Sequence, residues 1–391
     1  MKVVDVAEFY SELGGGVRTY IRQKLLAGLR TGHEVVVVAP GPADAEQRVD
    51  GGRIRWVKSP AEPLDSRYYR FADAAQVHRI LDLERPDVVE ASSPWRGARI
   101  VGTWSGTALK SLVLHNDPVA VYGHSLLDRI LSPDTIDRLC GPFWSYLAQI
   151  RRSFDTCIVA GAWLAGRMAG FGIDATAVPF GIDKAPFTPA LRDARLRNAM
   201  LAACGVTDAN AVLFVAVSRH HPEKRLGVLI DAMARIRRAR PAGLFLIGDG
   251  PLRGWIDRIA ARVDGVHVAG AINHAALPAH LASADIFLHA GAAETFGLAI
   301  AEAMCAGLPM VLPDRGGAAA LAGPSYAETY PAGDAVACAE AALRLAARDR
   351  ETLSRQAAEA SKTRVRSQLA HCEHLFGHYG DLLPATKRRA A

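Results

Sequence analysis

The sequence predicts an α/β protein built from two doubly wound parallel-sheet domains. The chain has 391 residues, which exceeds the roughly 100 to 200 residues of one ordinary domain. Half of the residues are apolar and 22% are charged, so each domain has enough apolar side chains for a core. Short β-branched runs alternate with helix-patterned segments, and this alternation is typical of parallel sheets built from βαβ units.

In the first half, short apolar runs alternate with candidate helices. The predicted strands are Val3–Val6, Glu34–Val38, Ile54–Val57, Asp87–Glu90, Leu112–His115 and Thr156–Val159. The stretch 177–189 contains three prolines and a glycine, which is typical of a linker.

The same alternation restarts after the linker. The predicted strands lie within 211–219, 243–250, 266–270, 285–291 and 309–314. Helical patterns dominate from about residue 335 to the end, and the last stretch, 369–383, lies beyond what the second sheet needs. We therefore expect an N-terminal domain over 1–180, a C-terminal domain over 181–365, and a final helix over about 366–391 that packs back on the first domain.

The net charge, the cysteine pattern and the apolar runs of the chain bear on its partners and its location. The formal charge of +6 fits an anionic ligand or an anionic membrane surface. Nucleic acid is not expected as a partner, because the sequence lacks a basic stripe interleaved with aromatics. The six cysteines are scattered without zinc spacing, as in a reducing compartment. The chain contains no signal segment and no apolar run long enough to span a bilayer. We expect a cytoplasmic protein, with peripheral contact at the inner face of the plasma membrane as a further expectation.

The segment 289–317, HAGAAETFGLAIAEAMCAGLPMVLPDRGG, combines a strand end, a loop, a helix and another strand. Glu294 lies in the loop, and Glu302 lies one or two turns into a helix that we expect to open near Phe296. Carboxylate oxygens at such places accept hydrogen bonds from sugar hydroxyls. The helix start, with Gly297 and Leu298, offers free backbone N–H groups to a phosphate. By spacing alone, the pattern is explained better by a charge at the helix N-terminus, Glu294, and a solvated helix residue, Glu302.

The segment 218–236 also follows a strand directly. Arg219 and Lys224 lie five residues apart across a short loop. Two cations placed in this way can converge on a diphosphate and stabilise leaving-group charge. An exposed basic loop without function is the alternative.

Two features of the first half are candidate parts of the same site. Gly15 and Gly16 belong to a glycine triplet after the first strand, which lets the backbone approach a phosphate closely, although such a triplet is often only a turn. The triplet does not match G-x-G-x-x-G, so the dinucleotide fingerprint is absent. His115 ends a predicted strand, where a histidine is usually a polar cap.

Taken together, these segments resemble the retaining GT-B glycosyltransferases of family 4, the glycosyl transferases group 1. The resemblance rests on the E-x7-E segment with Phe-Gly after its first Glu, on Arg219 and the Pro-Glu-Lys loop, on the glycine-rich first loop, and on VPFGID at 178–183. Two departures are Ser218, where the family has Gly, and three alanines at 318–320, where the family usually has a Glu.

The resemblance implies two facing Rossmann-like domains with an interdomain cleft. It implies transfer of a hexose from a UDP- or GDP-linked sugar to a glycan or lipid-linked acceptor. The implied catalytic residues are His115, Arg219, Lys224 and Glu294. The implied donor-binding residues are Gly15, Gly16, Arg219, Lys224, Glu294, Phe296, Gly297, Leu298 and Glu302.

The family needs no metal, and no cofactor is expected beyond the nucleotide-sugar substrate. His371, His374 and His378 share one predicted helical face, but three histidines on one helix rarely complete a metal site. A sugar-nucleotide epimerase of the same fold and a non-catalytic sugar-nucleotide-binding protein stay as alternatives. An NAD oxidoreductase is disfavoured by the missing fingerprint.

Overall fold

A computed structural model divides the chain into two compact units. The first comprises Met1–Asn116, Cys140–Gly181 and a third segment from Gln368, and the second comprises Asp117–Leu139 and Ile182–Ser367. The sequence prediction assigned 117–139 to the N-terminal domain, whereas these residues group with the second unit. The structure describes residues 1–11, 16–63, 65–127, 130–208 and 210–384.

In the described part of the first unit, eight strands form one sheet in the order β10-β9-β8-β7-β1-β2-β4-β3. All neighbours pair in parallel except β3 and β4, which are antiparallel. Its strands are β1 (Lys2–Val6), β2 (Glu34–Gly41), β3 (Ala45–Val49), β4 (Gly52–Lys58), β7 (Val88–Ala91), β8 (Leu109–Leu114), β9 (Thr156–Val159) and β10 (Thr176–Ala177).

Helices and a short hairpin complete the first unit. α1 and α16 pack against each other. Trp144 of α6 is buried and stacks on Phe171, with ring centroids 3.9 Å apart, so this side chain of α6 serves packing within the unit. The elements are α1 (Gly16–Arg30), β5 (Ala61–Glu62), β6 (Asp65–Tyr69), α2 (Ala74–Glu84), α3 (Arg96–Thr103), α6 (Gly141–Arg151), α7 (Ala162–Ala169) and α16 (Gln368–Leu382).

The second unit has a fully parallel sheet in the order β14-β13-β12-β15-β16-β17 across its described residues. Counted along the chain this order is 3-2-1-4-5-6, the arrangement of dinucleotide-binding folds. The order reverses between β12 and β15. The strands are β12 (Val212–Val217), β13 (Ala242–Ile247), β14 (Val266–Gly270), β15 (Ile286–Leu288), β16 (Met310–Pro313) and β17 (Ala327–Tyr330).

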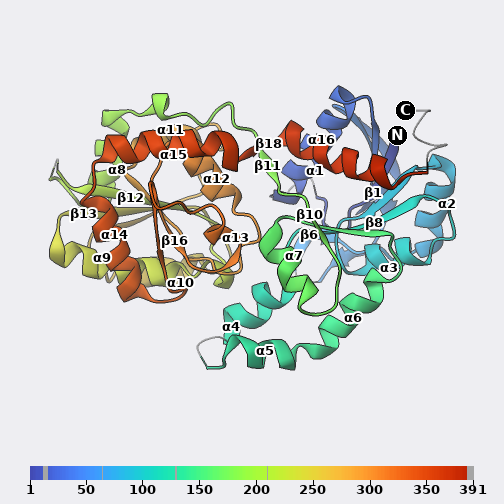
Figure 1. Cartoon of the computed structure of the whole chain (residues 1–391), viewed down its shortest axis with the longest axis horizontal. Helices are drawn as coiled ribbons and strands as arrows, with labels where there is room; N and C mark the ends of the chain where they lie inside the picture. The colour runs from blue at the N-terminus through green and yellow to red at the C-terminus, as the bar shows by residue number, and fades with distance from the viewer. Residues whose placement is uncertain (12–15, 64, 128–129, 209, 385–391) are drawn as a thin grey trace. The chain divides into compact units, whose positions relative to one another are not determined.

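Helices cover both faces of this second sheet (Figure 1). α9, α10 and α14 lie on one side, and α8, α11, α12 and α15 on the other. The helices are η1 (Val119–His124), α4 (Ser125–Leu127), α5 (Pro133–Leu139), η2 (Pro189–Leu191), α8 (Ala194–Ala203), η3 (Pro222–Lys224), α9 (Leu226–Ala239), α10 (Arg253–Ala260), α11 (Leu277–Ser283), α12 (Leu298–Cys305), α13 (Gly316–Ala319), α14 (Ala335–Ala346) and α15 (Arg350–Arg364). Short strands β11 (Gly181–Ile182) and β18 (Arg366–Ser367) lie where the chain passes between units.

The central strands are covered on both faces, as their continuous apolar sequences predict. Every residue from Val35 to Ala39 of β2 and from Leu213 to Val215 of β12 is fully buried. β3 and β17 were not predicted, because AEQRV and AETY carry too few apolar residues. Both are edge strands, which only one neighbour pairs with, and edge strands often carry charged side chains.

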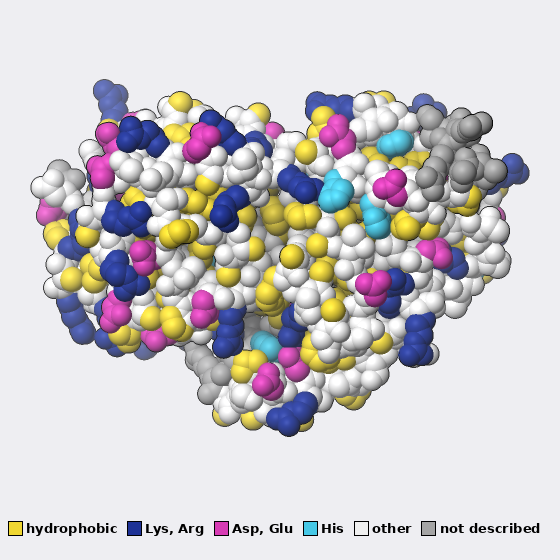
Figure 2. Space-filling model, in the orientation of Figure 1, with side chains coloured by type: hydrophobic (Ala, Val, Ile, Leu, Met, Phe, Trp, Pro, Cys, Tyr) yellow, Lys and Arg dark blue, Asp and Glu magenta, His cyan; other side chains and the backbone are white. Residues whose placement is uncertain are grey.

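Charged and apolar side chains are interspersed on the visible surface (Figure 2), without a continuous basic stripe on that face. In the described part of the chain, no helix combines the length and apolar character needed to cross a bilayer. The six cysteines are free thiols, and all except Cys140 are buried.

A buried ionic cluster holds the centre of the first unit. Lys24 of α1 is fully buried, and its ammonium pairs with Asp5 of β1 and Glu90 of β7. Tyr379 of α16 donates a hydrogen bond to Glu90 over 2.8 Å, and Ser92 donates to Asp5 over 2.5 Å. Burial favours the neutral amine, but the two carboxylates outweigh it and raise the pKa of Lys24. One side chain therefore links a helix, two central strands and the C-terminal helix.

We predict that Lys24→Met lowers the free energy of unfolding by about 3–5 kcal/mol, because it leaves two buried carboxylates without their cation. Urea denaturation of the whole chain measures this effect. Lys362→Met is the matched control, since Lys362 pairs with Glu359 while both side chains are about 70% exposed. That change should cost less than about 1 kcal/mol. Equal losses in the two variants would contradict a central role for Lys24.

Candidate active site

The candidate site lies on two loops that follow neighbouring parallel strands of the second unit. One loop follows β12 and contains η3, and the other follows β15 and leads into α12. β12 and β15 pair in parallel, with Phe214 opposite Ile286, so both loops leave the same edge of the sheet. The strand order reverses between these two strands, and ligands of open α/β sheets bind at that point.

Lys224 and Glu294 form the centre of the site. The Lys224 ammonium donates to Glu294 Oε2 over 2.7 Å, and the side chains are only 16% and 18% exposed. Burial alone would raise the pKa of Glu294, but Lys224 and His289 hold it well below its ordinary value. Burial would likewise lower the pKa of Lys224, and the Glu294 charge raises it instead. The pair is therefore ionised at neutral pH.

His289 is a third member of this cluster that the sequence analysis missed. Its Nε2 lies 3.4 Å from Glu294 Oε2, and the side chain is only 5% exposed. Tyr330 donates to the His289 carbonyl over 2.8 Å, which anchors the backbone. The sequence signal is a histidine directly after an apolar strand and five residues before Glu294.

Arg219 reaches the cluster through Glu223. Its guanidinium lies 3.1 Å from Glu223 Oε1, and the Lys224 ammonium lies 3.8 Å from the same oxygen. The Arg219 side chain is 72% exposed, so it is accessible to an anionic ligand. Arg219 and Lys224 thus share the buried Glu223 carboxylate, which offsets the repulsion between the two cations.

The loop after Glu294 turns sharply before α12. Phe296 is buried, Gly297 has φ +89°, and the helix begins at Leu298, two residues later than the sequence indicated. A Cβ at Gly297 would lie 2.7 Å from the Ile300 side chain, so glycine suits this position both sterically and in its backbone angle. The Gly317 amide donates to the Glu294 carbonyl over 2.5 Å, which holds the loop against α13.

Glu302 lies one turn into α12 and contacts a different partner. His274 Nε2 lies 3.8 Å from Glu302 Oε1. A hydrogen bond to Glu302 and its charge raise the pKa of His274. Glu302 is only 16% exposed. The structure thus links Lys224 with Glu294 directly and Arg219 through Glu223, while Glu302 forms a separate carboxylate–histidine pair.

The predicted residues of the first half belong to the first unit. His115 follows β8 and contacts the rings of Tyr20 and Phe180, with centroids 5.0 Å and 5.5 Å away. Burial lowers the pKa of His115 to about 4, so the imidazole is neutral at pH 7. Gly16 is the first residue of α1, and Gly15 lies outside the described residues.

Two of the three α16 histidines, His371 and His378, have separate partners. His371 is buried between the Pro179 carbonyl at 2.9 Å and the Tyr20 hydroxyl at 3.2 Å, and His378 lies 3.1 Å from the Thr156 hydroxyl. Among the described residues, no group of three or more histidine, cysteine, aspartate or glutamate side chains has the arrangement of a metal site.

Comparisons with known proteins identify the family. Residues 210–348 match the model described as glycosyl transferases group 1, and residues 15–181 match the model of the glycosyl transferase 4-like domain. The chain belongs to the group 1 glycosyltransferases. It is therefore an enzyme that uses a nucleotide-sugar donor, as the sequence predicted, and its two parallel-sheet units have the GT-B fold.

The chain is similar to several characterised mannosyltransferases. It is 29% identical to the GDP-mannose-dependent alpha-(1-6)-phosphatidylinositol dimannoside mannosyltransferase of Mycobacterium tuberculosis over 80% of this chain and 79% of that one. It is 26% identical over both full lengths to a GDP-mannose-dependent alpha-mannosyltransferase of Mycolicibacterium smegmatis. A solved structure of similar fold is sucrose-phosphate synthase from Thermosynechococcus elongatus, with TM-score 0.74, 18% identity, and coverage of 98% and 99% of the two chains.

We predict that Glu294→Gln lowers the free energy of unfolding by about 3 kcal/mol at pH 7, because it leaves the largely desolvated Lys224 ammonium without its hydrogen-bonded carboxylate and with only the more distant Glu223 as a counter-charge. The folded-state pKa of Glu294 is depressed, so its contribution is complete above the ordinary value of 4.5 and falls as the pH drops below that value. The difference from wild type should therefore be smaller at pH 4 than at pH 7. Urea denaturation at both pH values measures it.

Glu359→Gln is the control for this experiment, because Glu359 pairs with Lys362 on the surface. Its effect should stay below about 1 kcal/mol at either pH. A Glu294→Gln effect that did not change between pH 7 and pH 4 would contradict the depressed pKa.

Proposed function

We propose that this protein transfers mannose from GDP-mannose to a hydroxyl of a lipid-linked glycan, with retention of configuration at the anomeric carbon. The observation that carries the proposal is the partly buried Lys224–Glu294 ion pair at the reversal point of the second sheet. It supports recognition of a diphosphate and a sugar by neighbouring side chains. Both mycobacterial relatives use GDP-mannose, which favours it over a UDP-sugar. The phosphatidylinositol dimannoside substrate of one of them favours a lipid-linked acceptor.

The proposed roles follow from the charge of each side chain. Arg219 and Lys224 offset the negative charge that develops on the departing diphosphate. Glu294 accepts hydrogen bonds from the mannose hydroxyls, and Glu302 accepts them from the ribose. We assign to His115 the role of positioning the transferred sugar as a neutral imidazole.

The proposed chemistry needs no protein nucleophile. The bond between the anomeric carbon and the β-phosphate oxygen breaks, and its electron pair stays on the diphosphate. The acceptor oxygen forms the new glycosidic bond from the same face, and its proton moves to a phosphate oxygen. Since arginine and lysine supply the compensating charge, we propose that the enzyme requires no metal. A lipid-linked acceptor further implies peripheral contact with an anionic membrane.

The direct test compares GDP-mannose with GDP-glucose, UDP-glucose and UDP-galactose in the presence of mannosylated phosphoinositide lipids. We expect fastest turnover with GDP-mannose, an α-linked product by NMR, and the same rate with EDTA present. Preference for a UDP-sugar would overturn the GDP-mannose donor. A β-linked product would overturn retention, and loss of activity in EDTA would overturn metal independence. Formation of a 2-epimer of the donor without acceptor would indicate an epimerase instead.

We predict that Lys224→Met lowers kcat/KM for GDP-mannose by about 10²- to 10³-fold, because a preorganised charge at the leaving group is lost. Steady-state kinetics measure this change, and a thermal melt checks that the variant is folded. Lys362→Met removes the same charge from an exposed pair and should leave kcat/KM unchanged. A fully active Lys224→Met enzyme would exclude Lys224 from the reaction.

A further inference from the structure

A concave site lies in the second unit at the opposite edge of the sheet from the candidate active site. It is a hollow of about 370 Å³ whose walls include the starts of β12 and β15. Parallel strands have all their amino ends on one edge and all their carboxyl ends on the other. The hollow is therefore separated from Lys224 and Glu294 by the length of β12 and β15.

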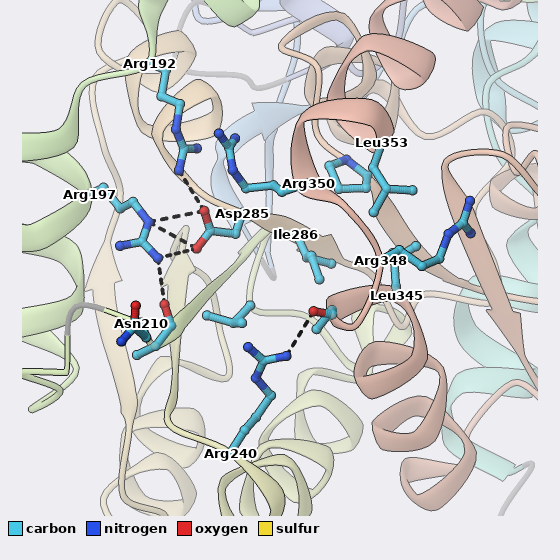
Figure 3. A pocket seen from close by; sticks show the side chains of 14 residues that line it. Arg192, Arg197, Asn210, Arg240, Asp285, Ile286, Leu345, Arg348, Arg350 and Leu353 are labelled. Atoms are coloured by element: carbon cyan, nitrogen blue, oxygen red, sulfur yellow. Dashed lines mark hydrogen bonds and ion pairs between the residues drawn. The ribbon is translucent and has the colours of Figure 1, made fainter.

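Arginines dominate the charged side chains of this hollow (Figure 3). Asp285 is the one carboxylate among the described lining residues. Two further carboxylates interact with lining arginines: Glu328 with Arg348, and Glu351 with Arg350. Guanidinium groups stay charged at any physiological pH, so five cations face at most three carboxylates. The lining arginines are Arg192, Arg197, Arg240, Arg348 and Arg350.

Most of these guanidiniums are held in place by backbone carbonyls, which satisfy donors without cancelling charge. Arg192 donates to the Ala284 carbonyl over 2.6 Å and also pairs with Asp285. Arg240 donates to the Ala346 carbonyl over 2.9 Å, and Arg348 donates to the Ser325 carbonyl over 2.7 Å. The hollow is thus built from rigidly placed cations.

Two groups retain donor capacity toward the hollow. Among the described residues, no hydrogen bond or ion pair engages the Arg350 guanidinium, which points from α15 toward Arg192 and Asp285 in Figure 3. The Arg240 Nε is buried and has no hydrogen-bond acceptor in the described structure. A buried donor without an acceptor is costly, and an anion in the hollow would supply the missing acceptors.

We propose that this arginine hollow binds a small ligand carrying one or two phosphate groups. Guanidiniums match phosphate oxygens in charge and in bidentate geometry. The volume suits a compact molecule that is enclosed on several sides. The site is independent of the nucleotide-sugar site, because the two occupy opposite edges of the same sheet.

Pyrophosphate titration by calorimetry tests the proposal. The parent chain carries Arg219→Ala and Lys224→Ala, which removes the two cations of the candidate active site. We expect saturable binding to this chain. Adding Arg350→Gln should weaken binding by about tenfold, the value of one charge-assisted hydrogen bond, whereas Arg350→Lys should retain most of it.

Arg355→Gln is the matched control. Arg355 lies on the same helix, is exposed and donates to Thr352 within α15, so its loss should leave the affinity unchanged. A lack of saturable binding to the parent chain, or equal affinities with Arg350→Gln and Arg355→Gln, would overturn the proposal. A thermal melt without ligand checks that each variant is folded.

Two further measurements separate this proposal from its alternatives. Arg350-dependent binding to phosphatidylglycerol vesicles without binding of pyrophosphate would assign the hollow to lipid headgroups and overturn a free ligand. Turnover of GDP-mannose by the single Arg350→Gln variant should equal that of wild type. The pyrophosphate titration does not depend on which sugar the enzyme transfers. If the mannosyltransferase assignment proved wrong, the test of the arginine hollow would still stand.

Discussion

Parallel pairing of β12 with β15 is the constraint on which the chemistry of the second unit depends. The two strands are separated in sequence by some 70 residues, yet they lie side by side with Phe214 opposite Ile286. One edge of this pair therefore carries both loops of the candidate active site, and the other edge carries the arginine hollow. The connections that separate the strands in sequence supply α9 and α11, which cover the two faces of the sheet. A single register thus fixes two charged sites at a distance from each other.

The two units use buried charge in different ways. In the first unit, Lys24 is surrounded by Asp5, Glu90 and their hydrogen-bonding partners, and no anion is needed to complete the cluster. In the second unit, the Lys224–Glu294 pair remains partly exposed at the sheet edge. A fully buried pair is costly to disrupt, since removal of one partner leaves an uncompensated charge. A partly exposed pair can exchange partners with a ligand.

Much of the fold was predictable from sequence, because parallel strands covered on both faces have continuous apolar runs. Edge strands β3 and β17 were missed, since polar residues hide their pattern. Glu294 and Lys224 were predicted as site residues from motifs that follow strands, and the structure pairs their side chains directly. His289 was missed because a single histidine after a strand is not distinctive by itself, although it lies only five residues before Glu294. The arginine hollow was missed for another reason. Arg197, Arg240 and Arg350 come from separate helices or loops, and only the folded sheet brings them into the walls of one hollow. Local patterns do not contain that information.

The resting Lys224–Glu294 pair suggests how donor binding proceeds under the proposed function. A lysine ammonium has three donors, and a carboxylate accepts several hydrogen bonds. A diphosphate beside Lys224 therefore takes up donors that Glu294 does not use, and it weakens the hold of Lys224 on the carboxylate. Glu294 then has acceptor capacity for sugar hydroxyls, while His289 keeps it oriented. Under the proposed function, diphosphate and sugar recognition are thereby coupled through one ion pair. A nucleotide diphosphate without its sugar would engage Lys224 but leave the acceptors of Glu294 without sugar hydroxyls.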